Sequence, residues 1–224
     1  MAAAIPSIAC LGVIGRNNNP LHITVFPSYD AATNTRAPLR TPIQFSLLLS
    51  STLDVFEARA RAGGSNTQQQ QSGGSSNVPI VSGDFGLLHA VDERLAAYGF
   101  ETNTGVRFVA VVDMRGRLPP GSVGAGSGGA PSSSAGIGAG GGGGGAGAGL
   151  RGGVGLREAE LRVVFRAMQT AYVRLLQNPF YDPDEHAPLV PPGGGGGGKR
   201  ITSRKFAEEM RRIGDSWAPG VVSL

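Results

Sequence analysis

One stretch of the chain literally matches the start of a phosphate-binding loop. Residues 193–199 read Gly-x-x-x-x-Gly-Lys, the pattern in which backbone amides cradle a phosphate. A working loop also needs Ser or Thr next, to hold magnesium, and a strand before the glycines. Arg200 follows instead, and Pro191 and Pro192 precede the run. Because an unbroken glycine run satisfies any glycine pattern, we interpret the match as compositional and predict no nucleotide site.

Side chains that bind metals or act as nucleophiles are few and isolated. The three histidines, His22, His89 and His186, lie in different segments, and Cys10 is the only cysteine. No His or Cys pair has the spacing of metal ligands, and nothing in the sequence distinguishes one serine as an activated nucleophile. We therefore predict no metal, no cofactor and no catalysis by this chain alone. A single cysteine also excludes an internal disulfide and suits a reducing compartment.

Nucleic-acid binding is poorly supported by the residue types. Arg151-Gly152-Gly153 is a single copy of a triplet that RNA-binding segments repeat, and aromatic residues make up only 6% of the chain. Lys199 and Lys205 are the only lysines, so the formal net charge of +4 comes from arginines scattered along the chain. Scattered charge does not form the concentrated basic stripe that binds phosphates. We predict no nucleic-acid partner.

Asn178-Pro179-Phe180-Tyr181 fits the Asn-Pro-x-Tyr pattern of sorting peptides. A sorting peptide must be exposed and flexible to be recognised. Here the four residues directly follow a long predicted helix, and the two aromatic side chains could pack back onto it. We interpret them as the structural end of that helix.

Glycine divides the chain into patterned and low-complexity parts. Most of the 37 glycines lie in three segments, at 62–78, 118–155 and 184–200, which carry too few apolar residues to offset their ordering entropy. The remaining residues suffice for one hydrophobic core, so we expect a single domain over 1–224 with three insertions. No apolar run reaches the roughly 18 residues of a membrane-spanning helix. The apolar N-terminus lacks the basic region of a signal peptide.

The patterned segments predict an α+β protein. Apolar runs and period-two alternation indicate five strands, at 8–14, 21–26, 85–91, 95–101 and 106–113. Helical periodicity indicates three helices, at 42–61, 157–177 and 203–213. Residues 27–40 are expected to form a polar loop. The order β-β-α-β-β-β-α-α favours a mainly antiparallel sheet with helices on both faces.

The first predicted helix has two contrasting faces. Thr41 suits its N-cap and Pro42 its first helical position. At about 100° per residue, the face expected to meet the sheet carries Phe45, Leu48, Leu49, Thr52 and Phe56. The opposite face carries Ile43, Leu47, Ser50, Ser51 and Asp54.

That opposite face is a candidate interface with another protein. A helix with one buried face should be polar on the other, yet Ile43 and Leu47 are apolar and the serines are small. Such a composition suits close packing against a partner, with Asp54 available for a charge-assisted hydrogen bond. The alternative is that the loop 27–40 folds over Ile43 and Leu47.

Several stretches together resemble the sedlin family of subunits of TRAPP, the transport protein particle, and in particular its subunit 2-like branch. They are 51–55 (Ser-Thr-Leu-Asp-Val), 102–113 (Thr-Asn-Thr-Gly-Val-Arg-Phe-Val-Ala-Val-Val-Asp), 178–183 (Asn-Pro-Phe-Tyr-Asp-Pro) and 203–206 (Ser-Arg-Lys-Phe). The resemblance covers nearly all of the patterned residues in order. The chain departs from the family at the three low-complexity insertions and the long loop 27–40, all at positions that are loops in the family.

The resemblance implies a fold and a function. The fold is the longin, or SNARE-like, fold, with a five-stranded sheet, one helix on one face and two on the other. The implied function is that of a small non-catalytic subunit of a cytoplasmic complex, peripheral at Golgi and ER–Golgi membranes, which tethers transport vesicles in ER-to-Golgi and intra-Golgi traffic. Its partners would be other TRAPP subunits and, indirectly, a Rab-type GTPase whose nucleotide exchange other subunits promote. The resemblance also places Asp54 on the family's Leu-Asp-Val motif, near where such subunits dock.

Two other functions compete with this one. The first is a stand-alone longin domain that binds SNAREs or small GTPases directly. A SNARE would be expected to continue into a heptad-patterned coiled coil and a membrane anchor, whereas this chain ends at Leu224 with neither. The second is a glycine-rich RNA-binding protein or a minor enzyme, and RNA binding would appear as salt-dependent retention on nucleic acid.

Overall fold

The structure is a computed structural model of the chain, and it describes residues 5–30, 33–65, 83–118, 158–183 and 199–224. The predicted insertions at 62–78, 118–155 and 184–200 lie outside the described residues except at their edges. The prediction was wrong at the start of the first insertion: the first helix does not end near Arg61 but continues to Ser65.

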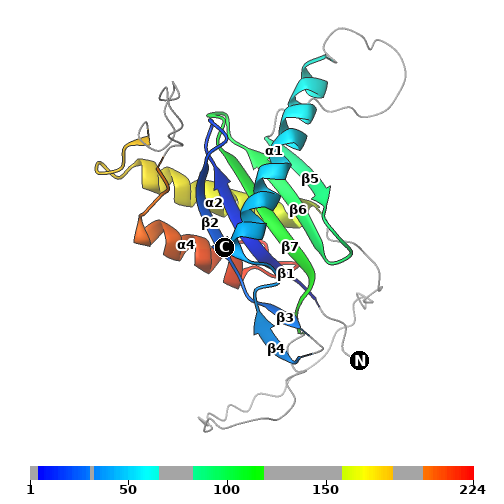
Figure 1. The fold of residues 1–224 in the computed structure, drawn as a ribbon. Coiled ribbons are helices and arrows are strands. Elements are labelled where there is room, and N and C mark those ends of the chain that lie inside the picture. Colours follow the sequence, from blue (N-terminus) through cyan, green and yellow to red (C-terminus); the bar gives the residue numbers. More distant parts are fainter. Residues whose placement is uncertain (1–4, 31–32, 66–82, 119–157, 184–198) are drawn as a thin grey trace, which may run out of the picture.

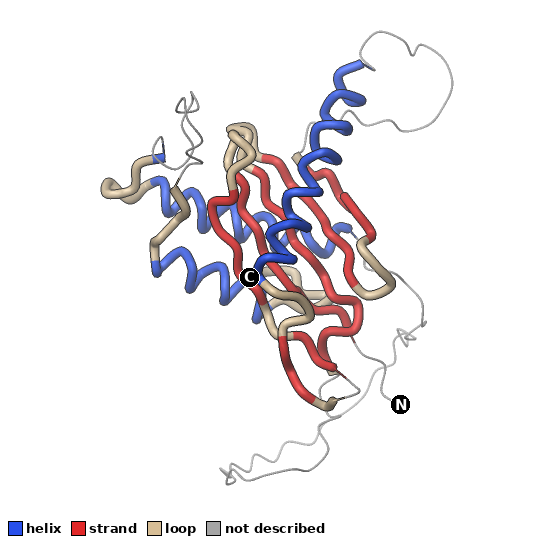
Figure 2. Tube along the Cα trace, in the orientation of Figure 1, coloured by secondary structure: helices blue, strands red, loops and turns tan. Residues whose placement is uncertain are grey.

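A five-stranded sheet forms the middle of the molecule (Figures 1 and 2). Its strands follow one another in the order β2-β1-β7-β6-β5, and every neighbouring pair is antiparallel. Their bounds are β1 Ile5–Ile14, β2 Pro20–Val25, β5 Asp84–Ala90, β6 Leu95–Glu101 and β7 Arg107–Arg117. The strand predicted at 106–113 is therefore the central one, as expected from its run of β-branched and aromatic residues.

Helices cover both faces of this sheet, as the sequence predicted. Figure 1 shows α1 (Pro42–Ser65) crossing one face, and α2 (Glu158–Leu176) and α4 (Arg204–Ser216) lying together on the other. The result is a three-layer α+β protein with one helix on one side and two on the other, which agrees with the longin-like fold that the motifs implied.

Strand β7 shows why two separate cores exist. Phe108, Ala110 and Val112 point into the core beneath α2 and α4, while Val109 and Val111 point into the core beneath α1. Successive side chains of a strand alternate between faces, and all five of these residues are completely buried. A strand segment that is apolar at every position, as residues 108–112 are, is therefore what a sheet covered on both faces requires.

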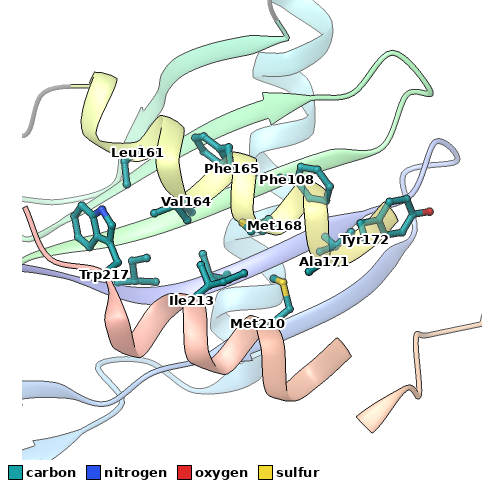
Figure 3. Close-up of a cluster of buried hydrophobic side chains, with 14 of the residues drawn as sticks. Phe108, Leu161, Val164, Phe165, Met168, Ala171, Tyr172, Met210, Ile213 and Trp217 are labelled. Atoms are coloured by element: carbon teal, nitrogen blue, oxygen red, sulfur yellow. The ribbon is translucent and has the colours of Figure 1, made fainter. Parts of the chain in front are cut away.

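The larger core lies between the sheet and the helix pair (Figure 3). Trp217, which follows α4, is fully buried, and its indole Nε1 donates a hydrogen bond to the carbonyl oxygen of Glu160 at 3.3 Å. Met168 of α2 and Met210 of α4 are also fully buried. Ser203 caps α4 by accepting a hydrogen bond from the amide of Phe206, and the helix continues to Ser216, three residues beyond its predicted end.

Residues 27–40 correct the prediction of a plain loop. Ser28–Asp30 forms β3 and Thr35–Ala37 forms β4, and the two pair antiparallel in a small separate sheet. The turn between them includes Asn34 in the left-handed region at φ 52°, which asparagine tolerates better than most residues. Strands of three residues are too short to show a period-two pattern, so periodicity could not predict them.

A candidate partner-binding surface on α1

The start of α1 is fixed by a reciprocal cap. The amide of Gln44 donates to the Thr41 hydroxyl at 3.3 Å, and the Thr41 amide donates to Gln44 Oε1 at 2.9 Å. This capping box satisfies two amides that the first helical turn would otherwise leave without partners. The predicted N-cap at Thr41 and first helical residue at Pro42 are confirmed.

Glycines on the sheet let the inner face of α1 approach closely. The five residues predicted to meet the sheet are all buried, and they are Phe45, Leu48, Leu49, Thr52 and Phe56. A Cβ atom at Gly12 would lie 2.6 Å from Leu49 Cδ1, and one at Gly99 would lie 2.4 Å from Phe56 Cζ. The absence of side chains at these two positions therefore sets the distance between the helix and the sheet.

Arg59 fixes the later part of α1 to the edge of the sheet. Its guanidinium donates hydrogen bonds to the backbone carbonyl oxygens of Phe85 and Leu87 on β5. Because the helix is fixed at its start by the cap and again at Arg59, the outer face between these points has a defined orientation.

The structure brings all five predicted interface residues together on that outer face. Ile43, Leu47, Ser50, Ser51 and Asp54 form one exposed stripe along the helix. Ile43 is 73% exposed and Leu47 is 66% exposed, which is unusual for large aliphatic side chains. Ala58 continues the same stripe and is also exposed; the sequence reasoning omitted it, although its spacing of four residues from Asp54 was visible.

The polar atoms of the stripe differ in how they are satisfied. The hydroxyl of Ser50 donates to the Ser46 carbonyl oxygen at 3.1 Å, and that of Ser51 donates to the Leu48 carbonyl oxygen at 2.8 Å. Both serine hydroxyls therefore donate their hydrogen bonds within the helix, and they have no donor left for the outer surface. Within the part of the chain that the structure describes, the Asp54 carboxylate has no hydrogen bond and no ion pair. The stripe thus offers apolar and small surface around one carboxylate.

The alternative cover for Ile43 and Leu47 is contradicted for the described part of the loop. The β3–β4 hairpin lies at the end of the sheet, where β3 contacts β7 and β1, and it leaves both side chains exposed. Arg94 holds it there by donating to the carbonyl oxygen of Tyr29 at 2.6 Å.

One prediction about an aromatic pair is half wrong. Tyr181 is partly buried against the core next to Tyr172, and burial raises the pKa of its phenol. Phe180 instead points away and is 95% exposed. The reason is local, because the Phe180 amide donates to the Asn178 side chain at 3.1 Å and fixes a turn that leaves the ring outside.

Across the described ranges, no group of three or more His, Cys, Asp or Glu side chains is placed to hold a metal ion. No helix among the described residues is long and apolar enough to cross a membrane.

Comparison with known proteins identifies the family. The sequence model described as Sedlin matches residues 13–216, a range that runs from β1 to the end of α4. The chain belongs to the sedlin family. The membership that the motifs indicated is therefore confirmed, and the exposed Asp54 is a feature of a sedlin-family helix.

Individual relatives of this sedlin-family chain are distant but cover most of its length. It is 23% identical over 176 residues to the trafficking protein particle complex subunit 2-like protein of Mus musculus, covering 79% of this chain and 84% of the relative. It is 20% identical over 207 residues to the protein of the same name from Dictyostelium discoideum, covering 92% of this chain and 95% of the relative.

Proposed function

We propose that this sedlin-family chain is a non-catalytic adaptor subunit of the TRAPP complex. The relatives from animals and from Dictyostelium discoideum both carry the name of a trafficking protein particle complex subunit, and the family match spans nearly the whole chain. In this proposal the protein takes part in ER-to-Golgi and intra-Golgi transport. It reaches Golgi membranes through the complex, as a cytoplasmic peripheral component, and residues 1–224 form one sedlin-like domain with three insertions.

The observation that carries the adaptor role is the exposed stripe of α1. A monomer gains nothing from leaving Ile43 and Leu47 in water, since burying such side chains stabilises by about 1.5–3 kcal/mol each. The small side chains of Ser50 and Ser51 let a partner pack closely against the stripe, and Asp54 provides one exposed carboxylate. Protein interfaces combine a closely packed centre with a polar rim in this way. We propose that another TRAPP subunit covers it.

Nucleotide exchange on a Rab-type GTPase belongs, in this proposal, to the assembled complex and not to this chain. The isolated chain is expected neither to hydrolyse nucleotide nor to accelerate its release from a Rab GTPase. Robust exchange by the purified chain alone would contradict the adaptor role.

Affinity purification from native extract tests the proposal. The tagged full-length chain is expected to retain other TRAPP subunits in fixed ratio, identified by mass spectrometry. Retention of SNAREs or of a small GTPase without TRAPP subunits would instead indicate a stand-alone longin domain. Retention of RNA that is lost at high salt would indicate nucleic-acid binding.

A further inference from the structure

A groove runs between α2 and α4, on the face of the sheet opposite to α1. It has a volume of about 300 Å³, and its floor includes Val163 and Ala167 of α2 and Ile213 of α4. It continues toward the end of α2 into a second hollow of about 380 Å³. Arg174 and Glu209 line both parts, and their ion pair at 3.1 Å crosses between the two helices. Figure 3 shows α2 and α4 lying side by side over the buried core.

Arginines dominate the walls of the first part of this groove. The cationic side chains in its lining are Arg162, Arg166, Arg174 and Arg212. Among its described lining residues, Glu209 is the one acidic side chain, and residues 222–224 of this chain also line the groove. The groove therefore has an apolar floor between positively charged walls.

Two of these arginines form no ion pair with another residue that the structure describes. Arg162 pairs with Asp84 at 3.0 Å and Arg174 pairs with Glu209. Arg166 and Arg212 are exposed, and within the described ranges neither guanidinium forms a hydrogen bond or an ion pair. They lie on opposite walls, one on each helix.

Folding alone does not explain this arrangement. Arg162 and Arg166 are four residues apart on one helix face, and like charges at that spacing destabilise a helix by a few tenths of a kcal/mol. A guanidinium is well shaped to receive a carboxylate through two parallel hydrogen bonds. The charges would be compensated if carboxylates entered from outside the chain.

We propose that the groove between α2 and α4 docks an acidic amphipathic helix of a partner protein. Apolar side chains of that helix pack on the partly exposed Val163 and Ala167, while its Glu or Asp residues pair with Arg166 on one wall and Arg212 on the other. This is the helix-in-groove mode of recognition, with charges on the rim. A protein helix fits better than an anionic membrane, because the apolar lining lies within a hollow of about 300 Å³ and a flat lipid surface would touch the rim alone.

This surface goes beyond the α1 stripe, because the sheet separates the two. A chain that binds one partner through α1 and a second through the groove between α2 and α4 would hold the two partners on opposite faces of its sheet.

Fluorescence anisotropy with the full chain tests the proposal. The probe is a labelled helix-forming peptide with leucines at i, i+3, i+4 and i+7 and glutamates elsewhere, and its control has glutamines in place of the glutamates. We expect the glutamate peptide to bind more tightly than the glutamine peptide. The double variant Arg166→Glu/Arg212→Glu should weaken its binding by about tenfold or more, since each lost pair is charge-assisted. Arg211→Glu, next to Arg212 but outside the groove lining, should change binding by less than about twofold.

The remaining outcomes overturn the proposal. They are that the wild type does not bind the glutamate peptide, that the double variant binds it as tightly as the wild type does, or that Arg211→Glu weakens its binding as much as the double variant does. Sedimentation with vesicles of phosphatidylcholine and phosphatidylserine is measured in parallel, and arginine-dependent vesicle binding without peptide binding would assign the face to a membrane. If the double variant fails to fold, Arg166→Gln/Arg212→Gln takes its place and must still weaken binding of the glutamate peptide.

Discussion

Arg94 and Asp113 form a two-pronged ion pair whose carboxylate is completely buried. Arg94 Nε lies 2.8 Å from Asp113 Oδ1 and its Nη2 lies 2.9 Å from Oδ2, while the Asp113 side chain is 0% exposed and that of Arg94 is 28% exposed. The bond with Asp113 raises the pKa of Arg94. The same guanidinium also donates to the Tyr29 carbonyl oxygen, so one pair joins β6, β7 and the β3–β4 hairpin.

Breaking this pair should destabilise the fold. Asp113→Asn keeps the side-chain volume but leaves the Arg94 charge without compensation, so we expect a loss of about 3 kcal/mol, at the lower end for buried pairs because Arg94 is partly exposed. Urea unfolding measures the loss. Arg204→Gln is the control, because it removes an exposed pair with Glu208 and should cost less than about 1 kcal/mol. Equal losses of unfolding free energy from the two substitutions would contradict the claim that burial of Asp113 makes its ion pair the more important one for stability.

Filling the glycine beneath α1 should also destabilise the protein. Gly99→Ala places a Cβ 2.4 Å from Phe56 Cζ and 2.5 Å from Leu88 Cδ1, and such overpacking costs about 1–3 kcal/mol. The double variant Gly99→Ala/Phe56→Leu should recover part of that loss relative to the sum of the two single variants, because the smaller side chain makes room. Strict additivity of the two losses in urea unfolding would contradict the proposed contact.

His22 should make stability depend on pH on the acid side. Burial lowers the pKa of His22 below its ordinary value of 6.5, against a smaller raising effect of the hydrogen bond with the Ile201 backbone. Its ring packs edge-on against Phe206. Below about pH 6.5 the unfolded chain therefore binds more protons than the native chain. The contribution of neutral His22 to the free energy of unfolding is complete above that pH and is lost as the pH falls.

His22→Gln should make the decline shallower. Urea midpoints at about pH 7.5 and about pH 5 measure the difference for wild type and variant. His89→Gln, at an exposed position, controls for the loss of an imidazole. The same slope in wild type and His22→Gln would contradict a role for this histidine.

Cys10 should react only when the protein unfolds. The residue is 0% exposed, and burial raises the pKa of its thiol, so the reactive thiolate is scarce and inaccessible. Iodoacetamide should label the native chain far more slowly than the chain in urea, as measured by mass spectrometry. Rapid native labelling would mean that the β1 region opens readily.

The elements that sequence reasoning placed well are those with a long uninterrupted pattern. The strand Leu95–Glu101 has the predicted bounds, and α2 begins and ends one residue inside its predicted range. The exposed stripe of α1 followed from the period of the helix alone, because Ile43 and Leu47 stand opposite a continuous apolar face.

What escaped prediction depends on contacts between distant residues. The Arg94–Asp113 pair needs the antiparallel register that sets Leu95 opposite Asp113. The position of the β3–β4 hairpin depends on a hydrogen bond that Arg94 donates to the carbonyl oxygen of Tyr29, 65 positions away. The spacing of Arg162 and Arg166 was visible in the sequence. Their relation to Arg212 exists only once α2 and α4 are packed together.

The most direct test of the α1 surface is to replace Asp54 by tyrosine and to measure assembly and unfolding separately. Asp54→Tyr should reduce co-purification of the full chain with TRAPP subunits, while the melting temperature of the isolated chain stays within about 4 °C of wild type, because the position is exposed. Asp215→Tyr makes the same change at an exposed position of α4, on the other side of the sheet, and should leave assembly intact. Unfolding of the isolated Asp54→Tyr chain, or undiminished assembly, would contradict a partner interface on α1.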